Sequence, residues 1–305
     1  MSFAGEVKAE LCRAPLSRRC CAQAELYGVL LYCNTYSSGE VRIITEHEDF
    51  AQRLPLLLKK ALRLTFDRLP DGTGKHIFVL SDPEKVAQVQ RAYGDDAGGL
   101  ALHINFAALE ESCCRIAFLR GAFLAGGSVT APQKGYHLEL VTSHQSVGRE
   151  MLALMRELDL EPKAAQRKGN AVLYFKQSNR IEDFLTSIGA PVAAMEIMNT
   201  KLEKDLRGSV NRRVNCDAAN LDKAVEAAMA QLEAIRVLDE AGLLTGLPEK
   251  LQETARLRRA HPEDTLAQQA ERYDPPITKS ALNHRLRKLV ELARRQQEEG
   301  GTTPP

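Results

Sequence analysis

Two segments of the chain repeat one pattern of apolar, small and polar positions. Residues 20–36 and 113–129 align without a gap at an offset of 93 positions. Six aligned pairs are identical: Cys20/Cys113, Cys21/Cys114, Ala24/Ala117, Leu26/Leu119, Gly28/Gly121 and Leu31/Leu124. The longest apolar run, from Leu26 to Cys33, is far too short to span a bilayer. The pattern therefore predicts an internal duplication in which each copy begins with an apolar helix.

The positions after each apolar segment also repeat. In the first copy we expect a strand over 40–45, a helix over 50–64, a strand over 75–80 and a helix opening at Asp82-Pro83. In the second copy we expect a strand over 136–142, a helix over 147–158, a strand over 171–176 and a helix over 180–188. Both copies are therefore predicted to be α+β units.

The two leading helices are expected to meet at a pseudo-twofold interface. Glycine inside a helix costs about 1 kcal/mol relative to alanine. Gly28, Gly121 and Ala125 have side chains small enough to let two helix backbones approach closely, which explains their presence there.

The C-terminal part has the pattern of three short helices, over 247–259, 266–272 and 279–295. Asp264 or Thr265 is suited to cap the second helix and Thr278 to cap the third. Asp274-Pro275-Pro276 makes a tight break between them. Three short helices with a sharp turn before the last one predict a helix-turn-helix domain.

The third of these helices has two different faces. Leu282, Leu286, Leu289 and Ala293 recur at helical spacing and should pack on the other two helices. Asn and Arg side chains pair with adenine and guanine edges, and hydroxyls and helix-start amides bind phosphate. We therefore predict a surface for double-stranded DNA made of Thr278, Lys279, Ser280, Asn283, His284 and Arg287, with Arg285 and Lys288 at its flanks.

Between the two parts, residues 195–220 are polar and charged. We expect a helix only from about Ala218 to Ala241, stopped by Gly242. Arg212 and Arg213 stand between Asn211 and Asn215. One interpretation is a segment that contacts phosphates through the two arginines. The other is a loop whose asparagines cap the following helix, and the residues do not decide between them.

Charge supports DNA binding only locally. The chain has 41 Lys+Arg against 40 Asp+Glu, a net charge of +1, which does not indicate a nucleic-acid partner. From Ile277 to Arg295, however, six basic residues face a single acid, Glu291.

The seven cysteines include two neighbouring pairs without C-x-x-C spacing, so we expect reduced, mostly buried thiols. Residues 1–15 lack the apolar core of a signal peptide, which predicts a cytoplasmic protein.

The duplicated unit resembles the LAGLIDADG homing-endonuclease fold. Against that motif, the first copy is residues 26–34 and the second is residues 119–127. The resemblance implies that the second acidic position of each motif would hold the catalytic metal. Those positions are Cys33 and Gly126 here. Magnesium needs hard oxygen ligands, so the resemblance extends to the fold and not to the nuclease chemistry.

The whole chain resembles the WhiA family of bacterial sporulation and cell-division regulators. The segments that carry this resemblance are Asn211-Arg-Arg-Val-Asn215 and Lys279-Ser-Ala-Leu-Asn-His-Arg285. The resemblance implies a nucleoid-associated transcriptional regulator with a role in cell division and chromosome segregation. It also implies other transcription or cell-division proteins as partners.

Together these patterns predict an α+β, duplicated αββαββα domain followed by an all-α helix-turn-helix domain. The expected boundaries are 1–110 and 111–205 for the two copies, 206–244 for a linker and connecting helix, 245–296 for the helix-turn-helix domain and 297–305 for a disordered tail. We expect no enzymatic activity, cofactor, metal, membrane or small-molecule substrate. The alternative is a metal-dependent DNA endonuclease or maturase whose acids are displaced, for example to Glu25, Glu46 or Glu139.

Overall fold

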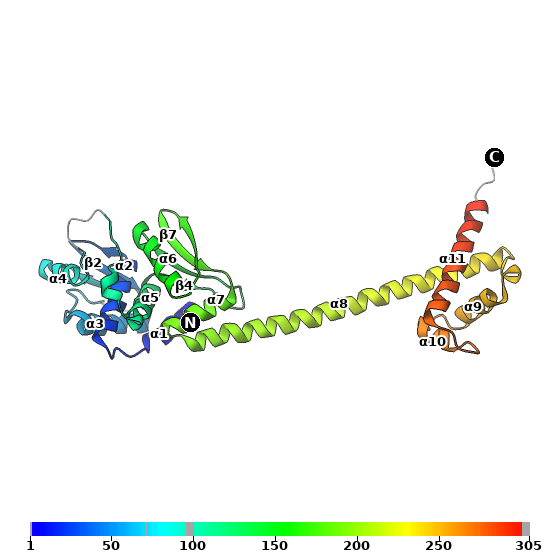
Figure 1. Cartoon of the computed structure of the whole chain (residues 1–305), viewed down its shortest axis with the longest axis horizontal. Coiled ribbons are helices and arrows are strands. Elements are labelled where there is room, and N and C mark those ends of the chain that lie inside the picture. Colours follow the sequence, from blue (N-terminus) through cyan, green and yellow to red (C-terminus); the bar gives the residue numbers. More distant parts are fainter. Residues whose placement is uncertain (1, 71, 73, 96–100, 301–305) are drawn as a thin grey trace. The chain divides into compact units, whose positions relative to one another are not determined.

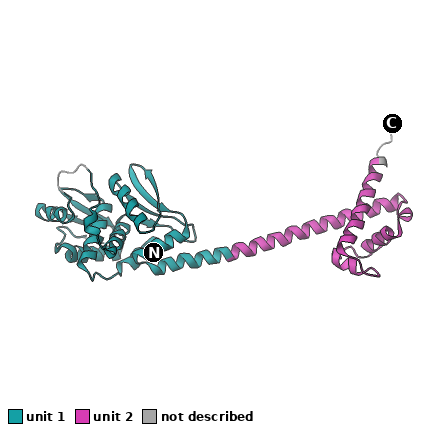
Figure 2. Ribbon diagram, in the orientation of Figure 1, with its two compact units in different colours: residues 1–205 teal, residues 206–305 magenta. Residues whose placement is uncertain are grey.

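The computed structural model describes residues 2–70, 72, 74–95 and 101–300 (Figure 1). The chain divides into two compact units, residues 1–205 and 206–305 (Figure 2). None of the described helices combines the length and apolar character that a membrane span requires.

The first unit contains the duplication. After α1 (Phe3–Cys12), the first copy comprises α2 (Arg19–Tyr32), β1 (Thr35–Tyr36), β2 (Val41–Thr45), α3 (Glu48–Leu62), β3 (His76–Leu80) and α4 (Pro83–Tyr93). A short 3-10 turn, Phe106–Leu109, leads into the second copy. That copy comprises α5 (Ser112–Gly126), β4 (Gly127–Val129), β5 (Leu138–Thr142), α6 (Gln145–Glu157), β6 (Lys163–Arg167), β7 (Asn170–Phe175) and α7 (Ser178–Ile188).

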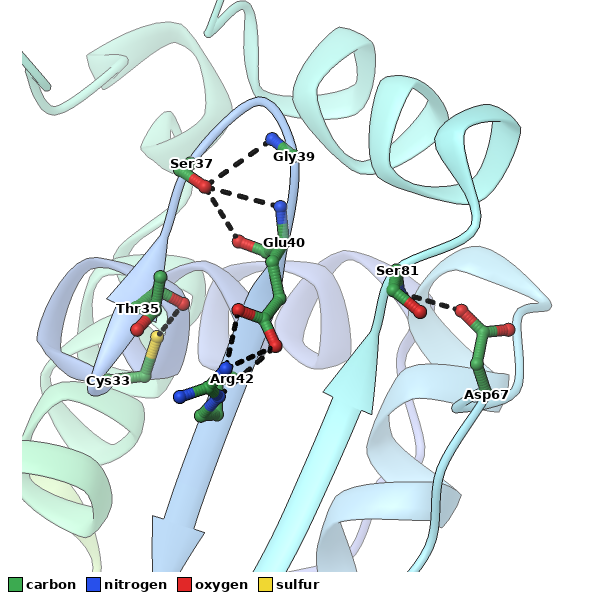
Figure 3. Close-up of polar contacts among 8 residues, drawn as sticks. All are labelled: Cys33, Thr35, Ser37, Gly39, Glu40, Arg42, Asp67 and Ser81. Carbon is green, nitrogen blue, oxygen red and sulfur yellow. Dashed lines mark hydrogen bonds and ion pairs between the residues drawn. The ribbon is translucent and has the colours of Figure 1, made fainter.

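Each copy has its own antiparallel sheet. The second copy has the full αββαββα order, with strands arranged β4-β5-β7-β6. The first has the order β1-β2-β3, and an isolated bridge between Arg68 and Val79 takes the place of its remaining strand. Pro70 follows this bridge and has no N–H to extend the pairing. Beside the bridge, Asp67 accepts a hydrogen bond from the Ser81 backbone N–H at 2.8 Å (Figure 3).

The two leading helices are in backbone contact, as the glycines predict. A Cβ atom added at Gly28 would lie 2.1 Å from the Phe118 carbonyl oxygen, and one added at Gly121 would lie 1.9 Å from the Glu25 carbonyl oxygen. No side chain larger than hydrogen fits at either position without moving a helix. The buried residues of both copies form one continuous core around this contact. The α+β fold class and the duplication are thereby confirmed.

The second unit is entirely helical. It holds the end of α8 (Pro191–Glu240), a 3-10 turn (Leu244–Gly246), α9 (Glu249–Ala260), α10 (Leu266–Glu271) and α11 (Lys279–Gly300). The break expected between residues 195 and 218 is wrong, because α8 is one uninterrupted helix of 50 residues. Its first third carries opposite charges four residues apart, Lys201 with Asp205 and Glu203 with Arg207, which favours a helix.

Two smaller expectations also change. The tail was expected to lose structure from residue 297, but α11 continues to Gly300, and residues 301–305 lie outside the described residues. The thiols were expected to be mostly buried. Only Cys114 is buried, Cys20 and Cys216 are exposed, and the other four are partly exposed.

The helix contact gives a direct test. We expect Gly121→Ala and Gly28→Ala each to lower the free energy of unfolding by about 1–3 kcal/mol or more, because the new methyl group meets a backbone carbonyl. Gly39→Ala is the matched control, since a Cβ there meets nothing within 4 Å. Chemical denaturation of the three variants measures the difference. Equal stability of Gly121→Ala and Gly39→Ala would contradict the backbone contact.

Candidate DNA-binding surface

Local caps fix the starts of α10 and α11. The Thr265 hydroxyl accepts the Gln268 N–H at 3.3 Å while the Gln268 side chain accepts the Thr265 N–H at 3.0 Å, forming a capping box. At the start of α11 the Thr278 hydroxyl accepts the Ala281 N–H at 3.2 Å. The cap at Thr278 was predicted from the sequence, and the structure selects Thr265 over Asp264 as the cap of α10. Such caps are predictable because capping depends on side chains within one turn of the helix start.

The inner face of α11 packs against two clusters. Leu282 and Leu286 lie with Ala270 and Tyr273, and none of the four is more than 4% exposed. Leu289 and Ala293 pack farther along with Ala234, Ile235 and Leu238 from the end of α8 and with Ala255 from α9. The boundary expected at residue 245 therefore cuts through a core. A fragment that begins at residue 247 lacks three of the six buried residues in this second cluster.

The outer face of α11 carries most of the predicted site residues. Lys279, Ser280, Asn283, His284 and Arg287 are all exposed, as is the capping residue Thr278. Among the described residues these five side chains have no hydrogen bond or ion pair. Asn283 and Arg287 are one helical turn apart, about 6 Å along the axis, so both point to the same side of the helix. This face is therefore free to meet an external partner.

The two flanking residues have partners within the protein. The Arg285 guanidinium lies over the Tyr273 ring, 5.2 Å from its centroid, and the residue is partly buried. Lys288 forms an ion pair with Glu291 at 3.2 Å, and Arg295 shares the same carboxylate at 2.6 Å. Arg285 thus helps to pack the domain, and a DNA contact for it or for Lys288 stays a prediction.

A buried polar network behind α11 was missed by the sequence analysis. The Tyr273 hydroxyl donates to Thr254 Oγ1 at 2.8 Å, and Thr254 donates to the Lys250 carbonyl oxygen at 2.7 Å. Arg258 is 3% exposed and donates to the Asp264 carbonyl oxygen at 2.9 Å. Burial lowers the pKa of Arg258 from its usual value, an effect that the Asp264 charge opposes. The contact between Tyr273 and Thr254 joins residues that are 19 positions apart, and no local pattern indicates it.

Arg212 and Arg213 are not part of this surface. Both are exposed in the interior of α8 together with Asn211 and Asn215, so the interpretation of a loop with capping asparagines is wrong. Arg213 precedes Ala234, where α8 enters the C-terminal core, by about 30 Å of helix axis at 1.5 Å per residue. The two arginines would therefore need a separate stretch of backbone phosphate.

The positions that match the second acids of the LAGLIDADG motifs carry no carboxylate here. The Cys33 thiol has two carbonyl oxygens within hydrogen-bond distance of its one proton, that of Thr35 at 3.2 Å (Figure 3) and that of Leu30 at 3.1 Å. Burial raises the pKa of this thiol to about 12. A Cβ atom at Gly126 would lie 2.6 Å from the Val141 carbonyl oxygen and 2.8 Å from the Tyr32 ring. An aspartate does not fit at position 126 without a backbone shift.

The acids considered as replacements are already paired. Glu25 is buried and binds Arg53 through both carboxylate oxygens, at 2.6 and 2.9 Å, and Arg120 at 3.3 Å. Glu46 is exposed and lies 3.8 Å from Lys75. Glu139 binds Arg167 at 2.8 Å and His137 at 3.2 Å, and hydrogen bonding to Arg167 lowers its pKa. In the described part of the chain, no group of three carboxylates or histidines converges with metal-ligand spacing.

Both parts of the chain match known protein families. The model of the WhiA LAGLIDADG-like domain matches residues 115–207, and that of the WhiA C-terminal HTH domain matches residues 210–293. A protein of Ruminiclostridium cellulolyticum named "Probable cell division protein WhiA" is 37% identical over 307 residues, which covers 97% of this chain and 98% of that protein. The chain belongs to the WhiA family. A WhiA relative of the same name from Heliobacterium modesticaldum is 36% identical and covers 99% of this chain and 98% of its own length.

The solved structure of full-length WhiA from Thermatoga maritima has the same fold. It matches with a TM-score of 0.60 at 24% identity, covering 97% of this chain and 99% of that one. The WhiA helix-turn-helix match begins at residue 210, well before the boundary expected at 245, and includes the helix end that completes the C-terminal core.

Arg285 and Arg287 offer a contrast between packing and exposure. We expect Arg285→Ala to destabilise the helix-turn-helix by about 0.5–2 kcal/mol, because it removes the contact with Tyr273. We expect Arg287→Ala to change stability by less than about 0.5 kcal/mol, as for an exposed side chain without partners. Hydrogen exchange of the full chain, read in peptides from α9 to α11, measures both. The assignment is wrong if the two variants show the same protection.

Proposed function

We propose that this WhiA chain is a sequence-specific regulator that binds double-stranded DNA through α11. The observation that carries the proposal is the exposed, unpaired row Lys279, Ser280, Asn283, His284 and Arg287 on a helix whose other face is fully packed. A helix of this kind fits the major groove, where its first turns contact base edges.

The row divides by chemistry into two tasks. Asn283 and Arg287 carry the side chains that pair bidentately with adenine and guanine, so we assign base recognition to them. Lys279, Ser280 and the free backbone N–H groups at the start of α11 are suited to donate hydrogen bonds to phosphate oxygens. Lys288 would exchange Glu291 for a phosphate at the edge of the groove, which costs little because exposed ion pairs are weak.

We also propose that the duplicated domain cleaves no DNA. The support is steric and electrostatic: Gly126 has no room for a carboxylate, and Glu25 is bound to two arginines in the core. A displaced metal site, as in an endonuclease or maturase, remains the second candidate. It would have to use acids such as Glu46 and Glu139, which lie on different elements and are paired with other residues.

The cellular role follows the relatives. Because several are named probable cell division proteins, we propose a role in cell division. The chain would exert this role through transcriptional control and chromosome segregation. Such a role places the chain in the cytoplasm on the nucleoid, with other transcription or cell-division proteins as partners and no small-molecule substrate. Sequencing of genomic fragments retained by the purified full chain at controlled salt identifies its site and tests sequence preference.

On that site, substitutions in α11 should distinguish residues that recognise bases from residues that only contribute charge. We expect Asn283→Ala and Arg287→Ala to weaken specific binding by about 1–3 kcal/mol and to leave random DNA nearly unchanged. Lys288→Ala should weaken both alike and lower the slope of log K against log salt by roughly one unit. Arg256→Ala on α9, also exposed, is the charge-matched control. Equal losses on both DNAs for all three variants would show that α11 supplies only electrostatic attraction.

The absence of cleavage is tested separately. Incubation of supercoiled plasmid with the full chain in magnesium or manganese should leave the plasmid supercoiled, because no three carboxylates converge among the described residues to hold the metal. A mobility shift from the same mixture confirms that DNA is bound. Nicking that increases with protein and disappears with a chelator would favour the nuclease alternative. Glu46→Gln and Glu139→Gln would then locate its acids.

A further inference from the structure

Four cysteines converge where the two leading helices begin. Cys20 and Cys21 come from the first turn of α2, and Cys113 and Cys114 come from the first turn of α5. All four sulfur atoms lie within 4.8 Å of one another. Cys12, Cys33 and Cys216 are outside this group. We call these four residues the cysteine cluster.

The duplication builds this cluster. Helices α2 and α5 begin at Arg19 and Ser112, which are equivalent positions at the offset of the repeat, so each pair occupies the second and third residues of its helix. The backbone contact at Gly28 and Gly121 holds the helices close enough for the pairs to meet. Neighbouring cysteines are a poor chelating motif when alone. Two such pairs facing each other nevertheless supply four donors from two rigid elements.

The surroundings of the cluster act on its thiols in opposite directions. Burial raises the pKa of Cys21 to about 11 and also raises the pKa of Cys114, whereas hydrogen bonding with Cys21 lowers the pKa of Cys113. All four cysteines lie in the first turns of their helices, at the positive end of the helix dipole. Neither helix has a side-chain N-cap to neutralise that end. The Arg18 guanidinium adds a full charge, with its Nη1 3.8 Å from Cys113 Sγ. Thiolates at helix starts beside arginine are stabilised relative to thiols.

We propose that the cysteine cluster binds one Zn²⁺ ion as a closed tetrathiolate site. Zinc–sulfur bonds of about 2.3 Å in a tetrahedron put neighbouring sulfurs about 3.8 Å apart, so the cluster has to contract by at most about 1 Å. The cysteine sulfurs around a four-iron cluster are more widely spaced, and the arrangement therefore suits a single ion. Four thiols release four protons to solvent as zinc binds, and the resulting site carries a charge of −2.

Such a site would be structural. It would join the beginnings of α2 and α5. Cys33 and Gly126, which stand where the nuclease motif has its second acid, lie at the opposite ends of these helices. All four coordination positions are taken by sulfur, so no open position remains for water or substrate. A surface depression of about 350 Å³, lined in part by Cys21, Cys113 and Arg120, offers the ion an entry path. The ion would stabilise the folded state because the unfolded chain does not hold the two pairs together.

Metal content of the purified full chain tests the proposal. After incubation with zinc and removal of free metal, we expect one equivalent of zinc per chain by elemental analysis. Cys21→Ser with Cys113→Ser, one residue from each helix, should reduce it to near zero. Cys216→Ser is the matched control, because it removes an exposed thiol on α8 and should retain the full equivalent. Retention of zinc by the double variant, or its loss in Cys216→Ser, overturns the proposal.

Two further measurements keep the test decisive if the double variant does not fold. Cobalt added to the unsubstituted, reduced chain should give the intense visible and near-ultraviolet bands of tetrahedral thiolate coordination. A thiol-specific mercurial should release zinc from the zinc-loaded chain, and a chelator should lower its melting temperature by several degrees. Less than a fifth of an equivalent of bound zinc, or cysteine pairs joined as disulfides in the freshly purified chain, would show that the cluster is not a zinc site.

Discussion

The close approach of α2 and α5 is the constraint on which the rest of the first unit depends. At Gly28 and Gly121 the backbone of each helix occupies the space where the other helix would have a side chain. This contact joins two sheets and their covering helices into one core. It also places both ends of the two helices in register. At one end lie Cys33 and Gly126, and at the other lie the four cysteines.

At the far end of the same two helices, the positions that match the second acids of the LAGLIDADG motifs are Cys33 and Gly126. In the second copy Gly126 packs against the Val141 carbonyl and the Tyr32 ring, so a carboxylate there would disturb the sheet as well as the helix. Glu25, on α2, the helix that Cys33 follows, is bound to Arg53 and Arg120 in the interior. Removing one partner of a buried ion pair typically costs about 3–5 kcal/mol, and this acid therefore serves stability.

Sequence reasoning succeeded where structure depends on neighbours along the chain. The caps at Asp82 and Thr278 and the apolar stripe of α11 act within one or two turns, and all were predicted, while Thr265 was one of two candidates for its cap. It failed where the structure depends on contacts between residues far apart in the sequence, or where a polar segment has no local signal for helix or loop. Nothing local distinguishes an exposed helix from a polar linker, so the continuity of α8 through Arg212 and Arg213 was missed. The buried Arg258 and the convergence of the four cysteines depend on tertiary contacts.

For the second unit, the central claim is that Arg287 on α11 recognises a guanine. The most direct measurement is binding of the full chain to its site with each guanine replaced in turn by 7-deazaguanine, which lacks the N7 acceptor that arginine uses. We predict one guanine whose replacement weakens DNA binding by the unsubstituted chain but does not change DNA binding by the Arg287→Ala variant. If no such position exists, or if every replacement affects both proteins equally, α11 does not read the sequence through Arg287.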